Sequence, residues 1–569
     1  MKTLFLSTVP ESFDPTRHAA LGPWCFIGAE SVYPDWEKLP FAEPFATKDQ
    51  WAQATSDCHA LVEWLVKDWT GKMNARHGRD YSNRFWRILL LDFLIISVQG
   101  LWYRYLYMAD FAKRNEGRTF AVVLPGNETD WRIADLKAFF RVFTSAAFDQ
   151  WMSSLLVGIA LPGDWPRRRE GHIDGYVPPP VDNAPSDRES QGGRLARRIF
   201  GRLAVNAVPG MRIAKIPLSL FAALLPRGGP AKTYYRTPAA APGVFPQPFL
   251  DILERFLLAT LPRSLTDGFT ELETKSRRHA YYPRRLLIDV AASPDDGLRM
   301  IAAQAHEAGE KLVSIQHGGW YGIARTTQRG ALTEYPYHGF ISWGWRAQED
   351  IAGNFMALPS LALHRIADKH RQRNGSVILV GANLTLRHSR IGWMPKLAHT
   401  LDCRRQRLTF IGALEESPAA ALVYRPYLRK LREIEDEDFL ARHYPGVPSL
   451  DGDLTEAMLE CRLLILDHPG STMLSALAAN VPTIGYWDPA AWPLCRQAKD
   501  LFAELVERGI VFADARLAAQ QVNRIWPDVG GWWSGRDIQD LRRRWCRQFA
   551  WTTPLWPVLW LKGMWSLSR

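Results

Sequence analysis

The segment Leu463–Pro489, LLILDHPGSTMLSALAANVPTIGYWDP, constrains the fold more than any other part of the chain. A short apolar strand runs through a tight polar turn at 467–472 into a small-residue helix and then a second strand. At such a helix start, free backbone N–H groups and the positive end of the helix dipole bind anions. Ser471 and Thr472 would add hydroxyl donors, so an α/β fold with a phosphate-linked substrate is predicted. An ordinary helix cap is the alternative, because Ser and Thr also favour that position.

Length and composition limit the classes of protein that remain. A chain of 569 residues is too long for one core, so we expect two domains or more. The net charge of +11 indicates an anionic partner, such as a nucleotide, a membrane surface or an acidic glycan, unless the surplus is spread diffusely. No basic run is interleaved with stacking aromatic residues, so no nucleic-acid partner is expected. Six scattered cysteines without a CxxC pair indicate a reducing cytosol rather than a disulfide scaffold or a zinc site.

Two features bear on membranes. The N-terminus has too short an apolar run for a signal peptide, so a cytoplasmic protein is expected. The apolar stretch Ile88–Met108 is either a buried helix or a membrane span, and Asp92, Gln99 and Arg104 within it favour the buried helix.

The first part of the chain mixes strands with long helices. Predicted strands lie at Leu4–Val9, Trp24–Glu30 and Phe120–Gly126, and predicted helical stretches at 48–112 and 131–161. Residues 163–193 have no periodic apolar face and read as a loop or an insertion. The basic and apolar segment 194–227 is either a membrane-surface helix or a core strand flanked by helices, and its internal prolines favour the second interpretation.

A regular alternation of strands and helices follows. Predicted strands of the first series are 285–291, 311–318 and 338–345, with a helix at 295–310 and a helical linker at 346–374. Those of the second series are 376–383, 407–414, 421–427, 462–469, 481–487 and 509–514. Near-continuous apolar strands between helices indicate parallel sheets covered on both faces.

Two doubly wound, Rossmann-like domains facing a cleft are therefore expected, which is a GT-B-like α/β layout. The predicted units are an N-terminal domain with helical insertions at 1–355, a C-terminal domain at 356–535 and a tail at 536–569 that packs back on the first domain. The tryptophans and basic residues of this tail could touch a membrane surface, but packing on the protein is the favoured interpretation.

Candidate site residues follow from the rule that ligands lie beyond the carboxyl ends of parallel strands. The run Gln316–Gly322, QHGGWYG, leaves a predicted strand directly into a glycine pair. The imidazole of His317 titrates near physiological pH and could take a proton from an acceptor hydroxyl. The alternative is a turn that needs two glycines. Acceptor binding or a supporting role is assigned to Gln316, Gly318, Gly319 and Tyr321.

Three further charged residues are candidates. Glu334 could orient His317, bind an acceptor hydroxyl or be an exposed loop carboxylate. Arg425 ends a predicted strand and could pair with phosphate, or be a surface arginine before a proline turn. Asp467 belongs to the predicted phosphate corner with Ser471 and Thr472.

Several common site motifs are missing from the sequence. There is no P-loop, no GxSxG elbow, no HExxH and no paired-cysteine ligand set. The aspartates of Asp451–Asp453 lie in a loop before a helix rather than at a convincing strand end. No metal and no resident cofactor are therefore predicted.

The motifs QHGGWYG and SWGW (Ser342–Trp345), with Arg425–Tyr427 and NVPT (Asn480–Thr483), resemble a family of bacterial transferases from O-antigen and other surface-polysaccharide gene clusters. The resemblance covers nearly the whole chain. It implies a GT-B-like glycosyltransferase that uses a nucleotide-activated sugar and a glycan or lipid-linked acceptor, with peripheral contact to the inner membrane as a further expectation. The histidine–glycine step is also similar, at the level of the fold, to CDP-glycerol glycerophosphotransferases.

The chain departs from this family pattern at two places. A glutamate expected in the helix after the Ser/Thr turn is replaced by Ser475, and an aspartate expected before the WGW strand is replaced near Gly339. Many GT-B enzymes hold the donor ribose with that glutamate. A CDP-polyol phosphotransferase of teichoic-acid type and a non-catalytic glycan-binding relative therefore remain as alternatives.

Overall fold

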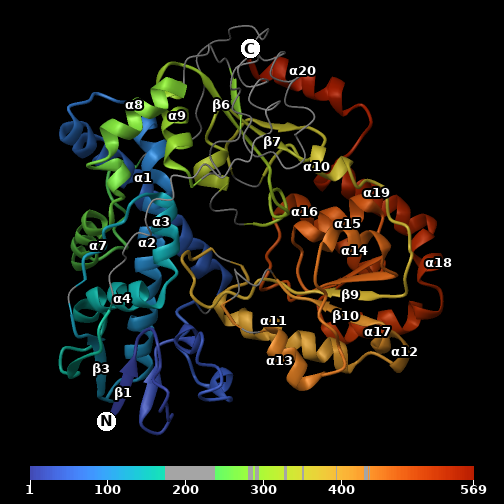
Figure 1. The fold of residues 1–569 in the computed structure, drawn as a ribbon, viewed down its shortest axis with the longest axis horizontal. Helices are drawn as coiled ribbons and strands as arrows, with labels where there is room; N and C mark the ends of the chain where they lie inside the picture. Colours follow the sequence, from blue (N-terminus) through green and yellow to red (C-terminus); the bar gives the residue numbers. More distant parts are fainter. Residues whose placement is uncertain are drawn as a thin grey trace.

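The computed structural model describes residues 1–45, 47–127, 129–173, 238–279, 286–288, 294–325, 330–348, 351–392, 394–427, 433–434 and 436–568. The described chain is a mixed α/β protein with three separate sheets, in which every strand pair is parallel. Figure 1 shows the first helices and strands on the left, the second sheet at the top and the third sheet on the right.

The N-terminal sheet has the strand order β2-β1-β3-β4. Its strands are β1 (Lys2–Phe5), β2 (His18–Ala20), β3 (Phe120–Pro125) and β4 (Arg167–Glu170). The long helices α1 (Lys48–His77) and α2 (Asn83–Arg114) pack against each other beside it (Figure 1). A capping box at Thr47 begins α1, and Gly78 ends it in the left-handed conformation that glycine adopts without strain.

Helix α2 is the buried axis of the N-terminal half. In the part of the chain that the structure describes, it is the one helix long and apolar enough to span a membrane, and its whole apolar window is buried inside the protein. Its charged side chains are paired, as buried charges must be: Arg87 with Glu63, Asp92 with Arg299 and Arg104 with Asp149. The prediction of a buried helix at 88–108 is confirmed.

Shorter helices surround α2. These are α3 (Leu136–Phe143), α4 (Ala146–Ala160), α7 (Gln247–Thr260), α8 (Phe269–His279) and α9 (Asp296–Glu307). Helices α4, α7 and α9 contact α2 directly. Short 3₁₀ turns lie at Pro23–Phe26, Trp36–Lys38, Arg263–Leu265 and Trp526–Asp528.

The central sheet has the order β5-β6-β7-β8. Its strands are β5 (Leu286–Ile288), β6 (Lys311–Ile315), β7 (Gly339–Ser342) and β8 (Phe355–Ala357), with a π-helical turn, η4 (Gly330–Glu334), between β6 and β7. Helix α9 contacts β6, and the last helix, α20 (Trp556–Ser568), covers the sheet through Trp560, Met564 and Leu567. Helix α10 (Leu361–His364) leads to the next sheet.

The C-terminal sheet has the order β10-β9-β11-β12-β13. Its strands are β9 (Val377–Val380), β10 (Leu422–Arg425), β11 (Leu463–Leu466), β12 (Thr483–Tyr486) and β13 (Val511–Phe512). Its helices are α11 (Leu397–Gly412), α12 (Glu416–Ala420), α13 (Asp436–His443), α14 (Leu454–Glu460), α15 (Ser471–Ala479), α16 (Arg496–Glu507), α17 (Ala515–Ile525), α18 (Val529–Ser534) and α19 (Arg536–Phe549). The chain turns from β10 on one side of β9 to β11 on the other, which is the switch that opens a ligand site in doubly wound sheets.

Two predicted strands are wrong. The apolar run 407–414 forms the end of α11, where Phe410 and Ile411 face the core of the C-terminal sheet. The segment expected as a strand from Trp24 begins as a 3₁₀ turn, because the buried indole of Trp24 donates to the Leu6 carbonyl over 2.9 Å. Strand β8 lies within the segment 346–374, which was expected to be a helical linker.

The division into sheets also differs from the expected pair. The part of the chain before β9 carries two four-stranded sheets instead of one, and the last strand of the second sheet, β8, lies at the expected domain boundary. The predicted loop at 163–193 contains strand β4, which extends the N-terminal sheet, and its residues beyond 173 lie outside the described residues. The interpretations given for 194–227 also fall outside them.

Candidate active site

Gln316 organises the turn that follows β6. Its side-chain oxygen accepts hydrogen bonds from the Trp343 backbone N–H and from the Trp345 indole, both over 2.9 Å. Its amide nitrogen donates to the Gly318 carbonyl over 3.0 Å. The residue is buried, so it serves the turn and not a ligand. This one side chain explains physically why the QHGG and WGW motifs occur together.

His317 is exposed at the end of β6 and belongs to a short hydrogen-bond chain. The Tyr321 hydroxyl lies 3.0 Å from His317 Nε2 and 3.3 Å from Nδ1, and it donates to Glu334 Oε1 over 2.9 Å. Because the hydroxyl hydrogen goes to Glu334, the phenol oxygen accepts an imidazole N–H. The other ring nitrogen of a neutral imidazole then keeps its lone pair, as a general base requires.

Glu334 ends the π-helical turn η4 and is 1% exposed. A carboxylate at this depth has no surface to offer to an acceptor hydroxyl. Its link to Tyr321, whose hydroxyl also contacts His317, supports the interpretation that it orients His317 through the phenol. The π-helical geometry places Glu334 beside Tyr321, and π-helical turns are frequent at functional sites.

The Tyr321→Phe variant is expected to lower kcat about tenfold with little change in KM, because the imidazole loses the group that holds its orientation. The pH dependence of kcat should shift as well, which a purely structural loss would not produce. Tyr444→Phe is the matched control, since its hydroxyl donates to a backbone carbonyl at 3.1 Å far from His317. A Tyr321→Phe enzyme with the wild-type pH profile would contradict the relay.

The turn after β6 touches the first turn of α15. The Gly319 N–H donates to Ser471 Oγ over 2.9 Å. A Cβ on Gly319 would lie 2.5 Å from the Ser471 nitrogen and 2.7 Å from the Gly470 oxygen, both of them backbone atoms. Glycine is therefore required for this close approach. His317 lies two residues before Gly319, so this contact brings it close to the predicted phosphate corner. We call the region formed by residues 316–322 and by the start of α15 the junction.

The start of α15 is not capped in the ordinary way. Gly470 is the N-cap residue and no side chain caps the helix, so Ser471 and Thr472 occupy the first turn itself. Among the described residues, none accepts a hydrogen bond from the backbone N–H of either residue. Ser471 is exposed and Thr472 is half-buried. Two N–H groups and two hydroxyls thus gather at the positive end of a helix dipole, which suits an anion.

The Gly319→Ala variant is expected to force the two segments apart and to lower kcat about 10²-fold, because catalysis depends on sub-ångström positioning. Gly318→Ala is a close control, since its Cβ would meet only ordinary contacts at 3.7 Å or more. Steady-state kinetics and thermal unfolding of both variants test this. Equal activity of the two variants would show that the approach of Gly319 to Ser471 does not matter.

Asp467 lies under the junction rather than in it. Its buried carboxylate accepts from the Ala382 N–H and from His468 Nδ1, both over 2.8 Å, and from Arg407 Nε over 2.5 Å. Burial raises the pKa of Asp467, but the Arg407 guanidinium and the hydrogen bond from His468 outweigh burial and hold the pKa below its usual value. Both oxygens are occupied, so Asp467 positions its neighbours and does not hold phosphate itself.

His468 is a functional candidate that was not predicted from the sequence. Asp467 fixes its Nδ1, and its ring lies 6.0 Å from the Trp492 ring and packs against Gly470, directly before α15. A carboxylate behind an imidazole fixes the orientation and the tautomer of the ring. The Asp-His pair at the end of an apolar strand was the signal that could have identified it.

Arg425 ends the edge strand β10 and is not brought to Ser471. Its guanidinium donates to the Leu450 carbonyl over 2.7 Å. Arg425 and Leu466 both pair with Val380, so they lie at the same level of the sheet, about 10 Å apart across two strand spacings. Arg425 therefore borders the carboxyl edge of the sheet but has no contact with the junction.

Further contacts hold the junction together. The Trp320 and Trp492 rings stack at 4.8 Å with an angle of 4° between their planes. The Cys495 N–H donates to the Ile323 carbonyl over 2.8 Å, and the Arg325 N–H donates to the Pro493 carbonyl over 2.9 Å. Backbone pairing and aromatic stacking together fix how the central sheet meets the C-terminal sheet.

A second polar cluster lies at the carboxyl edge of the N-terminal sheet. Arg104 donates to Asp149 over 2.6 Å, and Arg387, from the loop after β9, lies 3.7 Å from the other oxygen of that carboxylate. Arg387 also donates to the Thr144 carbonyl over 3.1 Å. All three charged side chains are buried. They join the N-terminal half to the C-terminal sheet at a second place, which no local sequence pattern indicated.

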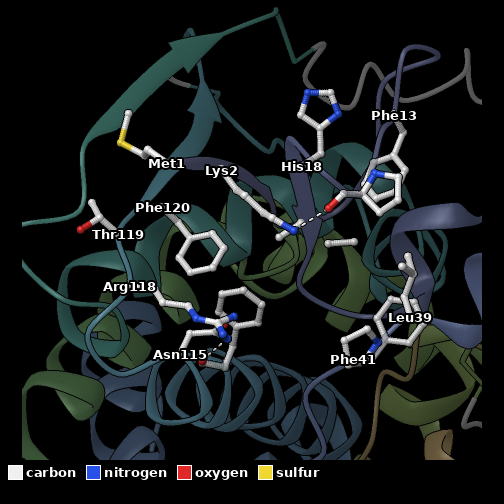
Figure 2. A pocket seen from close by; sticks show the side chains of 15 residues that line it. Met1, Lys2, Phe13, His18, Leu39, Phe41, Asn115, Arg118, Thr119 and Phe120 are labelled. Carbon is white, nitrogen blue, oxygen red and sulfur yellow. Dashed lines mark hydrogen bonds between the residues drawn. The ribbon is translucent and has the colours of Figure 1, made fainter.

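One cavity lies away from this chemistry. It has a volume of about 620 Å³ and opens at the amino ends of β1, β2 and β3. Figure 2 shows Lys2 in the middle, with Phe120, Arg118 and Asn115 on one side and Leu39 and Phe41 on the other. Parallel sheets bind their ligands at the carboxyl edge, so the junction is the better candidate site. Within the described residues, no group of three or more His, Cys, Asp or Glu side chains could hold a metal ion.

Comparison with known proteins gives one family. The model of the LIC12162 family transferases matches residues 2–564, which is nearly the whole chain. No curated protein matches the sequence. The candidate residues of the junction all fall within the matched range. The chain therefore belongs to the LIC12162 family of transferases.

Proposed function

We propose that this transferase is a metal-independent, GT-B-type glycosyltransferase that moves a sugar from a nucleotide-activated donor to a cell-surface glycan or a lipid-linked acceptor. The observation that carries the proposal is the hydrogen bond between Gly319 and Ser471. It holds an exposed imidazole from one sheet beside an anion-binding helix start from another. A base and a phosphate site in this relation are what glycosyl transfer from a nucleotide sugar needs.

In the proposed reaction His317 takes the proton from an acceptor hydroxyl as its oxygen bonds to the anomeric carbon of the sugar. The bond from that carbon to the donor phosphate breaks at the same centre, and negative charge grows on the leaving phosphate. The first-turn N–H groups of α15 and the hydroxyls of Ser471 and Thr472 would receive this charge. His468, oriented by Asp467, would add a donor beside them.

The N-terminal and central sheets, up to about residue 355, would bind the acceptor in this scheme, and the C-terminal sheet, at about 356–535, would bind the nucleotide. The donor is a substrate, and no resident cofactor takes part. The reaction would run in the cytoplasm, at the inner membrane, in the synthesis of a surface polysaccharide such as O-antigen.

Ser475 lies where the family pattern has a glutamate that would bind the donor ribose. It is half-buried on α15, one turn beyond Ser471, on the face that points toward the junction. A serine there can still reach a ribose, but its hydroxyl binds less strongly than the carboxylate that the family pattern leads one to expect.

Two alternative functions fit the same residues. A CDP-polyol phosphotransferase would use the same imidazole and the same phosphate corner. A relative without activity would bind glycan alone.

A donor screen tests the proposal. The full chain is incubated with CMP-, CDP-, UDP- and GDP-linked sugars and with CDP-glycerol, and thermal stability and donor hydrolysis are followed. Stabilisation and turnover with a nucleotide sugar support the glycosyltransferase. A response to CDP-glycerol alone would support the polyol phosphotransferase, and no response to any donor would support the glycan-binding relative.

A further inference from the structure

Exposed apolar side chains gather on and just before α20. Four large hydrophobic residues are well exposed within eleven positions of this segment: Leu555 (65%), Val558 (63%), Leu561 (37%) and Trp565 (39%). At 100° per residue they fall within one stripe about a third of the helix circumference wide. Elsewhere in the described residues, exposed large hydrophobic side chains occur singly, for example at Leu258 on α7 and Leu517 on α17.

The opposite face of α20 is already occupied. Trp560, Met564 and Leu567 pack on the central sheet, the Trp560 indole donates to the Pro359 carbonyl over 2.9 Å, and the Leu567 carbonyl lies 3.0 Å from His338 Nε2. The helix is therefore fixed to the protein and presents its second apolar face outward. Figure 1 shows α20 at the rim of the molecule, beside β6 and β7. A surface helix of a soluble protein normally has a polar outer face.

Two basic side chains close to this face in the sequence are not neutralised by an ion pair. Between Leu541 and Ser568 the sequence has no acidic residue and five basic ones, of which Arg542, Arg543 and Arg544 pair with Asp368, Asp540 and Glu504. Arg547 and Lys562 are exposed, and neither forms an ion pair with any described residue. A cavity of about 750 Å³ is lined by the four arginines, by Asp368 and Asp540, and by Trp551–Thr553, the residues that precede Leu555 in the sequence.

We propose that α20 docks this protein on an anionic lipid bilayer. Leu555, Val558 and Leu561 would enter the boundary between headgroups and acyl chains, and Arg547 and Lys562 would meet lipid phosphates. A second copy of the chain is the poorer occupant, because pairing two such faces would bring like charges together. The proposal does not depend on the reaction proposed above, because vesicle binding is measured without a donor or an acceptor.

Docking through α20 would also place the junction near the membrane. The helix covers the sheet whose strand β6 ends two residues before His317, and the Trp551 N–H, just before α20, donates to the Trp343 carbonyl over 2.9 Å. A lipid-linked acceptor would then reach His317 without leaving the bilayer surface.

Flotation of the full chain with vesicles tests the docking. Wild-type protein is expected to bind vesicles of phosphatidylcholine with phosphatidylglycerol about tenfold more tightly than vesicles of phosphatidylcholine alone. The double variant Val558→Gln/Leu561→Gln should bind the anionic vesicles about tenfold more weakly. Arg547→Gln/Lys562→Gln should lose the preference for anionic lipid. The matched control is Leu258→Gln/Leu517→Gln, which removes two apolar side chains elsewhere that are exposed at least as much (63% and 51%) and should bind like wild type.

Two results would overturn the docking. One is wild-type protein that does not float with anionic vesicles. The other is a concentration-dependent dimer in light scattering that Val558→Gln/Leu561→Gln abolishes while vesicle binding stays unchanged, since the face would then join two copies. A protein that binds vesicles but transfers no sugar would refute only the proposed reaction, and one that transfers sugar to a soluble acceptor without binding vesicles would refute only the docking.

Discussion

In the proposed sugar transfer, the His317→Ala variant is expected to be about 10²–10⁴-fold slower than wild type, which is the contribution of a positioned general base. The loss should appear in kcat, because the imidazole acts on the proton that moves in the reaction. His317 is exposed, and its contacts include the Tyr321 hydroxyl and, over 3.4 Å, the Ile315 carbonyl; an exposed imidazole contributes little to the stability of the fold. Its removal should therefore leave the thermal unfolding temperature nearly unchanged, and the two effects can be measured on the same preparation.

The control for this variant is His443→Ala. His443 is an exposed histidine on α13 whose imidazole contacts the carbonyl and the ring of Phe439 on its own helix. It should keep wild-type kinetics. If kcat of wild type falls at acid pH and the His317→Ala variant retains that fall, the titrating base is another group, and His468 would be the next to replace. Wild-type rates for His317→Ala would remove the assigned base outright.

The local parts of this structure could be predicted from the sequence. Strands β6 and β11 are buried on both faces, so each reads as a largely apolar run, interrupted in β6 by Ser314, that ends in polar and glycine residues. The Ser471–Thr472 pair indicates the start of the helix after β11. The charges that interrupt the apolar run of α2 indicate that α2 is a buried helix and not a membrane span. In each case the information lies within about ten neighbouring residues, which is the range over which periodicity acts.

The misassigned strand at 407–414 shows where this range fails. Its apolar residues fit a short buried strand as well as one face of a helix. The choice is made by contacts far along the chain, because Arg407 on α11 reaches Asp467 after β11, Asp436 at the start of α13 and the Tyr424 hydroxyl. The prediction of a loop where the structure has strand β4 is wrong for a related reason. Its sequence, RRRE, is charged and exposed, and it is a strand only because it pairs with β3.

The candidate site divides in the same way. His317, Ser471 and Thr472 could be selected because each lies at the end of a predicted strand or the start of a predicted helix. Orientation of His317 by Glu334 was one of three alternatives for that carboxylate, and the sequence could not show that the link passes through the Tyr321 hydroxyl. Asp467 was assigned to phosphate because it lies in the turn, whereas its depth below the surface is decided by Arg407, sixty residues away.

Asp467→Asn is expected to lower the free energy of unfolding by about 3–5 kcal/mol, the cost of removing one partner from a buried ion pair. The amide nitrogen would face the Arg407 Nε–H in place of a carboxylate oxygen, and two donors would oppose each other in the core. Asp436 and the Tyr424 hydroxyl remain on that guanidinium, which keeps the loss from being larger. Urea unfolding measures the change, with Asp402→Asn as control, because the pair of Asp402 with Arg405 is about half exposed and worth about 0–1 kcal/mol.

The pH dependence of this variant gives an independent check. The folded-state pKa of Asp467 is lowered, so its ion pair stabilises the protein fully above the ordinary pKa of the carboxyl, 3.8, and that stability is lost as the pH falls through the lowered value. The difference between wild type and Asp467→Asn should therefore be constant near neutral pH and shrink below about pH 4. A difference that persists unchanged in acid would show that packing of the side chain, and not its charge, stabilises the fold. Because the same carboxylate orients His468, the variant should also transfer sugar more slowly than its folded fraction alone predicts.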